Sequence, residues 1–194
     1  MNSRLLSEPP NDRELDVADN VRVQQMRTLF EGGAVATVAA TLFAFAMAYH
    51  MQGEVTNDAL ITWLAVKCVV ALPRIVHTML FARGPKNALR WLNEYRLLLL
   101  LDGLAWGSAA LMLMPANESD VTVLVATLCG VATISTFNIH GDWRSCVLFV
   151  VPMLAPLIGS LLLRFDAFGL YGGGAVLCYL YLLLSAARRS ERRV

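Results

Sequence analysis

Charged residues are scarce in this chain. Asp, Glu, Lys and Arg together make up 16% of its 194 residues, whereas 57% of the residues are hydrophobic. The mean hydropathy is +0.55. A soluble domain of this length has too little interior to bury so large an apolar fraction. The composition excludes an ordinary soluble protein and predicts an integral membrane protein.

Residues that bind metals are also few and scattered. The four cysteines, Cys68, Cys129, Cys146 and Cys178, lie far apart and lack the spacing of a metal site. We interpret them as buried structural thiols. His50 stands beside Met47 and Met51 and is interpreted as an interfacial residue. We therefore expect no metal site and no cofactor.

Several other sequence features are missing. The first 28 residues are polar and have no apolar core, so a cleavable signal peptide is not expected. The net charge is only +1 and no nucleic-acid motif is present, so nucleic acid is not an expected partner. A nucleophile with its base is lacking as well, so we expect no catalysis in this chain.

Six long apolar stretches dominate the chain, at residues 32–51, 59–82, 92–114, 121–139, 146–163 and 168–187. Each is close to the ~20 residues that cross the hydrocarbon core as a helix. Barrel strands are excluded because they would alternate apolar with polar residues. The sequence predicts an all-α polytopic membrane protein, a six-transmembrane-helix bundle.

Three regions follow from this division. Residues 1–28 form an N-terminal arm. The apolar residues of segment 15–30, which overlaps the end of this arm, have the spacing of an interfacial helix. Disorder and a partner-binding helix are the alternatives for that segment. Residues 29–187 form the transmembrane domain, and residues 188–194 begin a linker towards an effector.

The distribution of Lys and Arg predicts the orientation. Cations gather before residue 28, in the connection 83–90, at Arg144 and at the end of the chain, whereas segments 50–58 and 115–120 contain none. Because cytoplasmic loops carry the excess of Lys and Arg, both termini are expected in the cytoplasm. Arg164, in a predicted outer loop, is the exception. His140, Asp142 and Trp143 are interpreted as an interfacial anchor.

Ionisable residues inside the predicted helices are the strongest functional signal. Each costs several kcal/mol in a bilayer unless it finds a partner or water. Lys67 and Arg74 share one helix face with His77, because they are seven and three residues apart. Asp102 lies level with Arg74 on the next helix, so we expect these two to pair.

Other side chains complete this predicted polar network. Tyr95 and Trp106 fall on the same helix face as Asp102. Lys67 either extends towards the outer surface or joins Asp102 in a triad. An ion pair that only fixes the register of two helices explains the charges at least as well as a ligand site does.

Packing signals are frequent. Gly103 and Gly107 form a small-xxx-small pair, which favours close helix contact. Pro152 and Pro156 are expected to kink the fifth helix. The fourth stretch carries polar side chains suited to hydrogen bonds between helices, namely Thr122, Thr127, Thr133, Ser135, Thr136 and Asn138.

Several short motifs carry a resemblance to a known family. They are the run 63–74, Arg90 with Trp91, the run 102–107 (Asp-Gly-Leu-Ala-Trp-Gly), Pro115, and the run 151–156 (Val-Pro-Met-Leu-Ala-Pro). The chain resembles the six-helix, MASE-like sensor regions of bacterial membrane signalling proteins. Those regions precede diguanylate cyclase (GGDEF) domains or the histidine kinase cores of two-component systems. Beyond Arg193 this chain has no signature of either effector.

The resemblance implies a function. The chain is expected to be a sensory input domain in the bacterial inner membrane, in contact with the lipid bilayer. A homodimer is expected, with a small-molecule or lipid ligand. The sixth helix would pass the signal through Arg188 and Arg189 to the effector. The alternative is a small transporter or channel whose path is lined by Lys67, Arg74 and Asp102.

Overall fold

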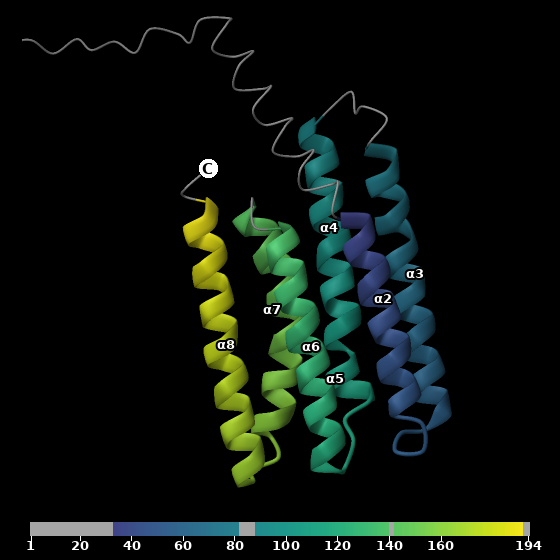
Figure 1. Cartoon of the computed structure of the whole chain (residues 1–194), viewed down its shortest axis with the longest axis vertical. Coiled ribbons are helices and arrows are strands. Elements are labelled where there is room, and N and C mark those ends of the chain that lie inside the picture. The colour runs from purple at the N-terminus through teal and green to yellow at the C-terminus, as the bar shows by residue number, and fades with distance from the viewer. Residues whose placement is uncertain (1–32, 82–87, 140–141, 192–194) are drawn as a thin grey trace, which may run out of the picture.

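The computed structural model describes residues 33–81, 88–139 and 142–191, and it is a bundle of helices (Figure 1). The predicted N-terminal arm, Arg83 with Lys86, and Arg192 with Arg193 lie outside the described residues. The helices are α2 (Gly33–His50), α3 (Asn57–Phe81), α4 (Ala88–Gly107), α5 (Ala109–Met112), α6 (Glu118–Ile139), α7 (Trp143–Leu162) and α8 (Ala167–Glu191).

Five helices of the described part are long and apolar enough to cross a membrane. The apolar part of α2, Val35–His50, is shorter. The predicted all-helical class is confirmed at this level, and the six apolar stretches coincide with α2, α3, α4 with α5, α6, α7 and α8. Long helices form here because an α-helix pairs its own backbone N–H and C=O groups. Continuous apolar runs can then lie in lipid without unpaired backbone groups.

The third stretch forms one apolar span over residues 90–112, but its helix is interrupted at Ser108. Helix α4 ends at Gly107 and the short α5 begins at Ala109. The indole Nε1 of Trp63 and the hydroxyl of Ser108 both donate to the carbonyl oxygen of Ala105, at 2.9 and 2.8 Å. In an unbroken helix that oxygen accepts the N–H of residue 109. Competition for this acceptor is a physical reason for the break.

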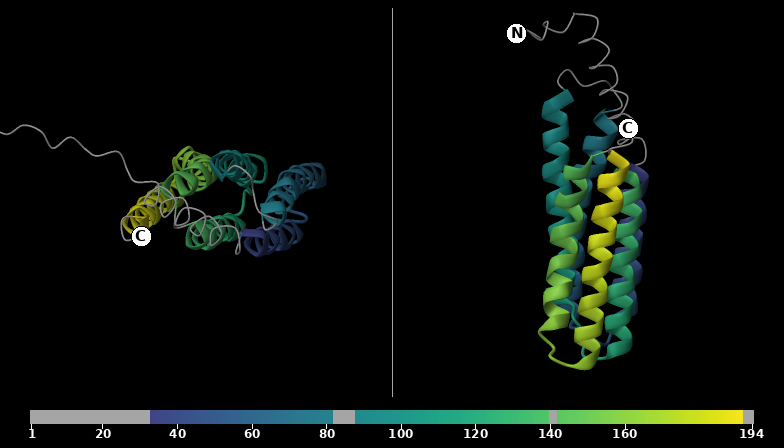
Figure 2. Two further views of the ribbon diagram at one scale, coloured as in Figure 1. Left: turned by 90° about the horizontal axis from the view of Figure 1, so that it is seen from above. Right: turned by 90° about the vertical axis from the view of Figure 1, so that its left-hand side faces the viewer.

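The helices are arranged as a ring with one helix outside it. Viewed from above, α2, α3, α4, α7 and α6 follow one another around the ring, and α8 lies at its edge (Figure 2). Helix α8 packs mainly against α7 and touches α6. Its outer face is exposed, with Tyr171 at 78% and Tyr181 at 71%.

Close backbone contact joins α4 to α7. A Cβ atom added to Gly103 would meet the carbonyl oxygen of Phe149, and one added to Gly107 would meet that of Pro152. The predicted packing role of the two glycines is therefore confirmed. Glycine is needed here because only a hydrogen atom fits between the two backbones.

Polar side chains of α6 divide between two roles. Thr133 bonds to the hydroxyl of Tyr179 on α8, and Thr136 accepts from the Cys146 thiol on α7, as predicted for bonds between helices. Thr133 and Thr136 also donate to carbonyls of α6 itself, and Thr122 and Asn138 bond only to such carbonyls. Short side chains in a helix readily reach the carbonyl one turn back, which the sequence pattern does not distinguish.

The two ends of the bundle differ in charge. The α2–α3, α5–α6 and α7–α8 connections lie together at one end, at the bottom of Figure 1, and Arg188 and Arg189 lie at the other. Arg164, the predicted exception, bonds to Asp166 at 3.2 Å, so its charge is locally compensated. Of the four thiols expected to be buried, Cys146 is buried, Cys68 and Cys129 are half-buried, and Cys178 is exposed.

Candidate functional site

Three buried charges meet between α3 and α4. Lys67 donates from Nζ to Oδ1 of Asp102, and Arg74 donates from Nη1 to Oδ2 of the same carboxylate. The three side chains are at most 3% exposed. The expected pair of Arg74 with Asp102 is formed, and Lys67 completes the triad instead of extending outward. We call Lys67, Arg74 and Asp102 the buried charge cluster.

Helix geometry explains how one carboxylate serves two cations. Lys67 and Arg74 lie seven residues apart on α3, which places both on the face that packs against α4. Asp102 projects from α4 between them and presents one oxygen to each. The cluster thereby fixes the register of the two helices.

Counted by formal charge, the buried charge cluster has one positive charge in excess. It holds two cations and one carboxylate, and within the described residues no second carboxylate forms an ion pair with Lys67 or Arg74. Aromatic faces offset part of the excess positive charge. Nζ of Lys67 lies 4.8 Å from the ring centre of Trp106, and Cζ of Arg74 lies 5.5 Å from that of Phe149.

Two hydrogen-bond donors in the buried charge cluster and next to it have no acceptor among the described residues. Nε of Arg74 and Nε1 of Trp106 are buried, and neither has a hydrogen-bond partner among the described residues. Buried donors are normally paired, because an unpaired one costs free energy. The cluster thus offers more positive charge and more donors than its own acceptors use, which suits an additional acceptor such as an anion.

Aromatic side chains close one side of the cluster. Trp63 and Trp106 are both fully buried and meet edge to face, with their ring centres 5.6 Å apart. Trp63 is fixed in turn by its bond to Ala105. The site residue Trp106 therefore borders Lys67, and Trp63 links α3 to the end of α4.

His77 and Tyr95 extend the network in the other direction. The ring of His77 stacks on that of Tyr95 at 6.3 Å, and Tyr95 lies 6.0 Å from Cζ of Arg74. Nε2 of His77 is 3.4 Å from Oε2 of Glu94, whose other oxygen accepts from Arg90. Glu94 was not among the residues predicted from the sequence, although its spacing of four residues from Arg90 is typical of an ion pair on one helix face.

A second ion pair was also missed. Nε and Nη2 of Arg96 on α4 each donate to an oxygen of Asp142 at 2.9 Å, and Ser145 donates to the same carboxylate. Burial alone would raise the pKa of Asp142, but the hydrogen bonds from Arg96 and Ser145 outweigh it and hold that pKa below its ordinary value. This pair ties α4 to the first turn of α7.

The remaining predicted positions lie apart from the cluster. Arg188 and Arg189 are exposed in the last turn of α8. His50 lies 3.2 Å from Asp120 at the opposite end of the bundle. In the part of the chain that the structure describes, no three His, Cys, Asp or Glu side chains are grouped to hold one metal ion.

The arrangement of these residues can be compared with known proteins. The chain matches no protein-family model, no curated protein and no solved structure. The resemblance to bacterial sensor regions therefore depends on the short motifs quoted above, and the role of each site residue depends on its own geometry.

Proposed function

We propose that this chain is the sensory input module of a bacterial signalling protein. In this proposal the six helices span the inner membrane with both termini in the cytoplasm. The module passes a stimulus through α8 to a cytoplasmic effector, a diguanylate cyclase or a histidine kinase. The observation that carries the proposal is the buried charge cluster, which holds more charge and donors than a structural pair needs.

The cluster supports a ligand with an acidic group. A carboxylate or a phosphate would neutralise the excess positive charge and accept from Nε of Arg74 or Nε1 of Trp106. The three charged side chains are closed off from solvent, so binding requires α3 and α4 to part. A ligand that prefers the parted arrangement would shift the bundle between two states.

A chain of close contacts leads from the cluster to α8. Asp102 is followed on α4 by Gly103, which touches the backbone of α7. Gly169 of α8 in turn lies against the backbone carbonyl of Leu161 on α7, and Gly173 lies against the side chain of Leu162. Because these interfaces are closely packed, a shift of α4 would move α7 and then α8.

The outer face of α8 suits a second copy of the chain. Tyr171, Ala175, Cys178 and Leu182 are exposed and are spaced by four, three and four residues. This is the heptad spacing of helices that pair along a seam. A parallel α8 pair would bring together Arg188 and Arg189 of two copies, and with them the start of two effectors.

The experiment follows the α8 pair with the natural thiol Cys178. Cys68, Cys129 and Cys146 are replaced by Ser, and disulfide formation between Cys178 residues is measured in native membranes. Asp102→Asn should change the crosslinking rate about fivefold or more, the lower end of typical allosteric coupling. Cys178→Ser is the control without a crosslink. Equal rates in the parent and in the Asp102→Asn variant would refute the proposal.

One observation favours a transporter as a second candidate. Polar groups continue from Asp102 through Arg74, Tyr95 and His77 to Glu94, whose side chain is 43% exposed. Ionisable residues of this kind mark ion and proton pathways in membrane proteins, although the guanidinium of Arg74 keeps its own proton. Purified protein in liposomes with an internal pH dye would then conduct protons, and Asp102→Asn would abolish the flux. Absence of flux in the parent protein eliminates this candidate.

A further inference from the structure

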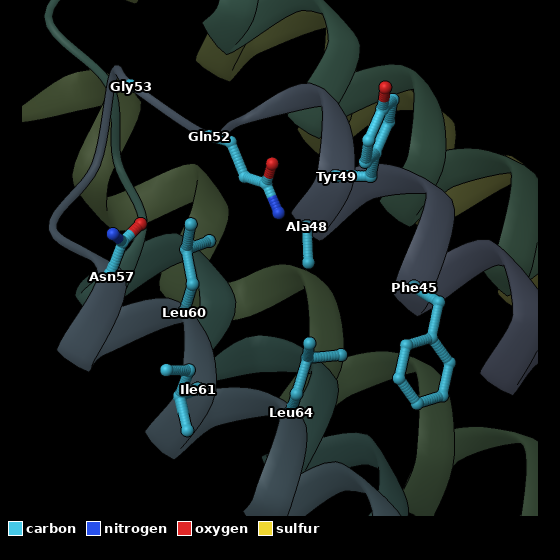
Figure 3. A pocket seen from close by; sticks show the side chains of 9 residues that line it. All are labelled: Phe45, Ala48, Tyr49, Gln52, Gly53, Asn57, Leu60, Ile61 and Leu64. Carbon is cyan, nitrogen blue, oxygen red and sulfur yellow. The ribbon is translucent and has the colours of Figure 1, made fainter.

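A cavity of about 860 Å³, open along one side, lies away from the buried charge cluster, and its lining residues Tyr49 and Ile61 are 76% and 65% exposed. It opens between α2 and α3, beside the 51–56 turn that joins them (Figure 3). This volume falls in the range of roughly 300–1,000 Å³ that small-molecule sites occupy. The cavity is therefore large enough for a ligand of its own.

The walls of the cavity are apolar. Phe45 and Ala48 come from α2, and Leu60, Ile61 and Leu64 come from α3 (Figure 3). Leu64 lies seven residues beyond the start of α3, which corresponds to a depth of about 10 Å along the helix. An apolar chain of that length fits along these walls.

The mouth of the cavity is polar but carries no charge. Tyr49, Gln52 and Asn57 provide a hydroxyl and two amides, and the Gln52 amide points between the two helices in Figure 3. Neither amide makes a side-chain hydrogen bond to another described residue. Glu54 and Asp58 are exposed next to the mouth. Their charges would repel an anionic head group.

We propose that this cavity binds an uncharged single-chain amphiphile that enters from the bilayer. Its apolar chain lies against Phe45 and Leu64, and its hydrogen-bonding head contacts the amides of Gln52 and Asn57. An uncharged head fits because no charged side chain lines the cavity. Binding of the amphiphile rests on the proposed function only in that it requires a bilayer around the bundle. It does not require an effector.

The position of the cavity also connects it with the charge cluster. Trp63 lies on α3 between the wall residues Leu60 and Leu64, and it contacts Trp106, which borders Lys67. An amphiphile that changes the packing of α3 against α2 would therefore act on Trp63. This gives the ligand a route to the cluster without entering it.

The test uses the full chain in phosphatidylcholine nanodiscs. The probe is a monoacylglycerol with a photoreactive diazirine in its acyl chain, and the labelled residues are mapped by mass spectrometry. Saturable labelling is expected within residues 45–64. Ile61→Trp fills the cavity and should lower this labelling about fivefold or more. Val69→Trp is the matched control, because Val69 and Ile61 are 67% and 65% exposed.

A fatty acid with the same chain tests the head group. Its carboxylate should reduce labelling about fivefold or more relative to the monoacylglycerol, through repulsion by Glu54 and Asp58. Equal labelling by both probes would overturn the uncharged head. Labelling spread over all exposed helices, or unchanged by Ile61→Trp, would overturn the site. Neither result depends on Cys178 crosslinking, so failure here is distinct from failure of the proposed signalling function.

Discussion

At the scale of single residues, the energetics of the buried charge cluster decide what it does for the protein. Removing three charged groups from water is costly, and the attraction between them repays this cost only with good geometry. Asp102 uses both oxygens, one for each cation. The excess positive charge distinguishes the cluster from a simple ion pair, and it makes the carboxylate the critical member.

Asp102→Asn should lower the free energy of unfolding by about 3 to 5 kcal/mol, because it leaves two buried cations without a counter-charge. The measurement is denaturant or thermal unfolding of the detergent-purified protein. The triple variant Lys67→Met, Arg74→Met and Asp102→Leu should recover most of that loss, since it removes all three charges. An unchanged stability in the single variant would show that the carboxylate does not hold the cations.

Stability should also depend on Asp142 at acidic pH. The pKa of Asp142 in the folded chain is held below its ordinary value by Arg96 and Ser145, despite burial. Its contribution is therefore complete above the ordinary value of about 3.9 and is lost as the pH falls through the lower folded-state pKa. The melting temperatures of the parent and of Asp142→Asn should differ at pH 6 and converge at low pH. A difference that stays constant with pH would contradict this role.

At the scale of elements, the contact between α4 and α7 is the tightest constraint in the proposed route to α8. Gly103 and Gly107 bring the backbone of α4 onto carbonyls of α7. Arg96 and Asp142 add an ion pair between the same two helices. These contacts connect α4 with α7 at several positions along the two helices, whereas α8 is held mainly by α7.

Gly107→Ala should destabilise the protein by about 1 to 3 kcal/mol, because the new methyl group forces α4 and α7 apart. Unfolding in detergent measures the effect. Gly130→Ala on α6 is the matched control, since a Cβ atom there meets nothing within 4 Å. The control should be neutral or stabilising by up to about 1 kcal/mol, as helix propensity favours Ala over Gly. Equal losses in both variants would remove the close-packing explanation.

At the scale of the whole molecule, the charge difference between the two ends predicts the orientation of the bundle. The end with Arg188 and Arg189 is expected in the cytoplasm, and the end with Glu54 and Asp120 outside. The pairing of Arg164 with Asp166 removes the one local conflict with this assignment.

Single cysteines introduced without the four natural ones should reveal this orientation. Glu54→Cys should react with a membrane-impermeant maleimide in intact spheroplasts, because Glu54 is exposed at the outer end. Arg189→Cys should react only after the membrane is permeabilised. Mass labelling on gels measures both. The reverse pattern would invert the topology and would separate α8 from any cytoplasmic effector.

The sequence by itself determined the helices and much of the cluster. Hydropathy and hydrogen bonding along a helix depend on neighbouring residues, so the six apolar stretches predict the helical elements. Depth along two consecutive helices was enough to pair Arg74 with Asp102. The same reasoning could not decide whether Lys67 joins them, because its long side chain can reach in either direction.

The tertiary structure alone decided which distant helices touch. Arg96 finds Asp142, 46 residues away, because α4 lies beside α7 in the ring, and the sequence contains no signal for that order. The ring also leaves α8 outside, and a cavity opens between α2 and α3 beside the turn that joins them. Side-by-side packing depends on the shapes of whole helix faces, which emerge only when all the helices are assembled.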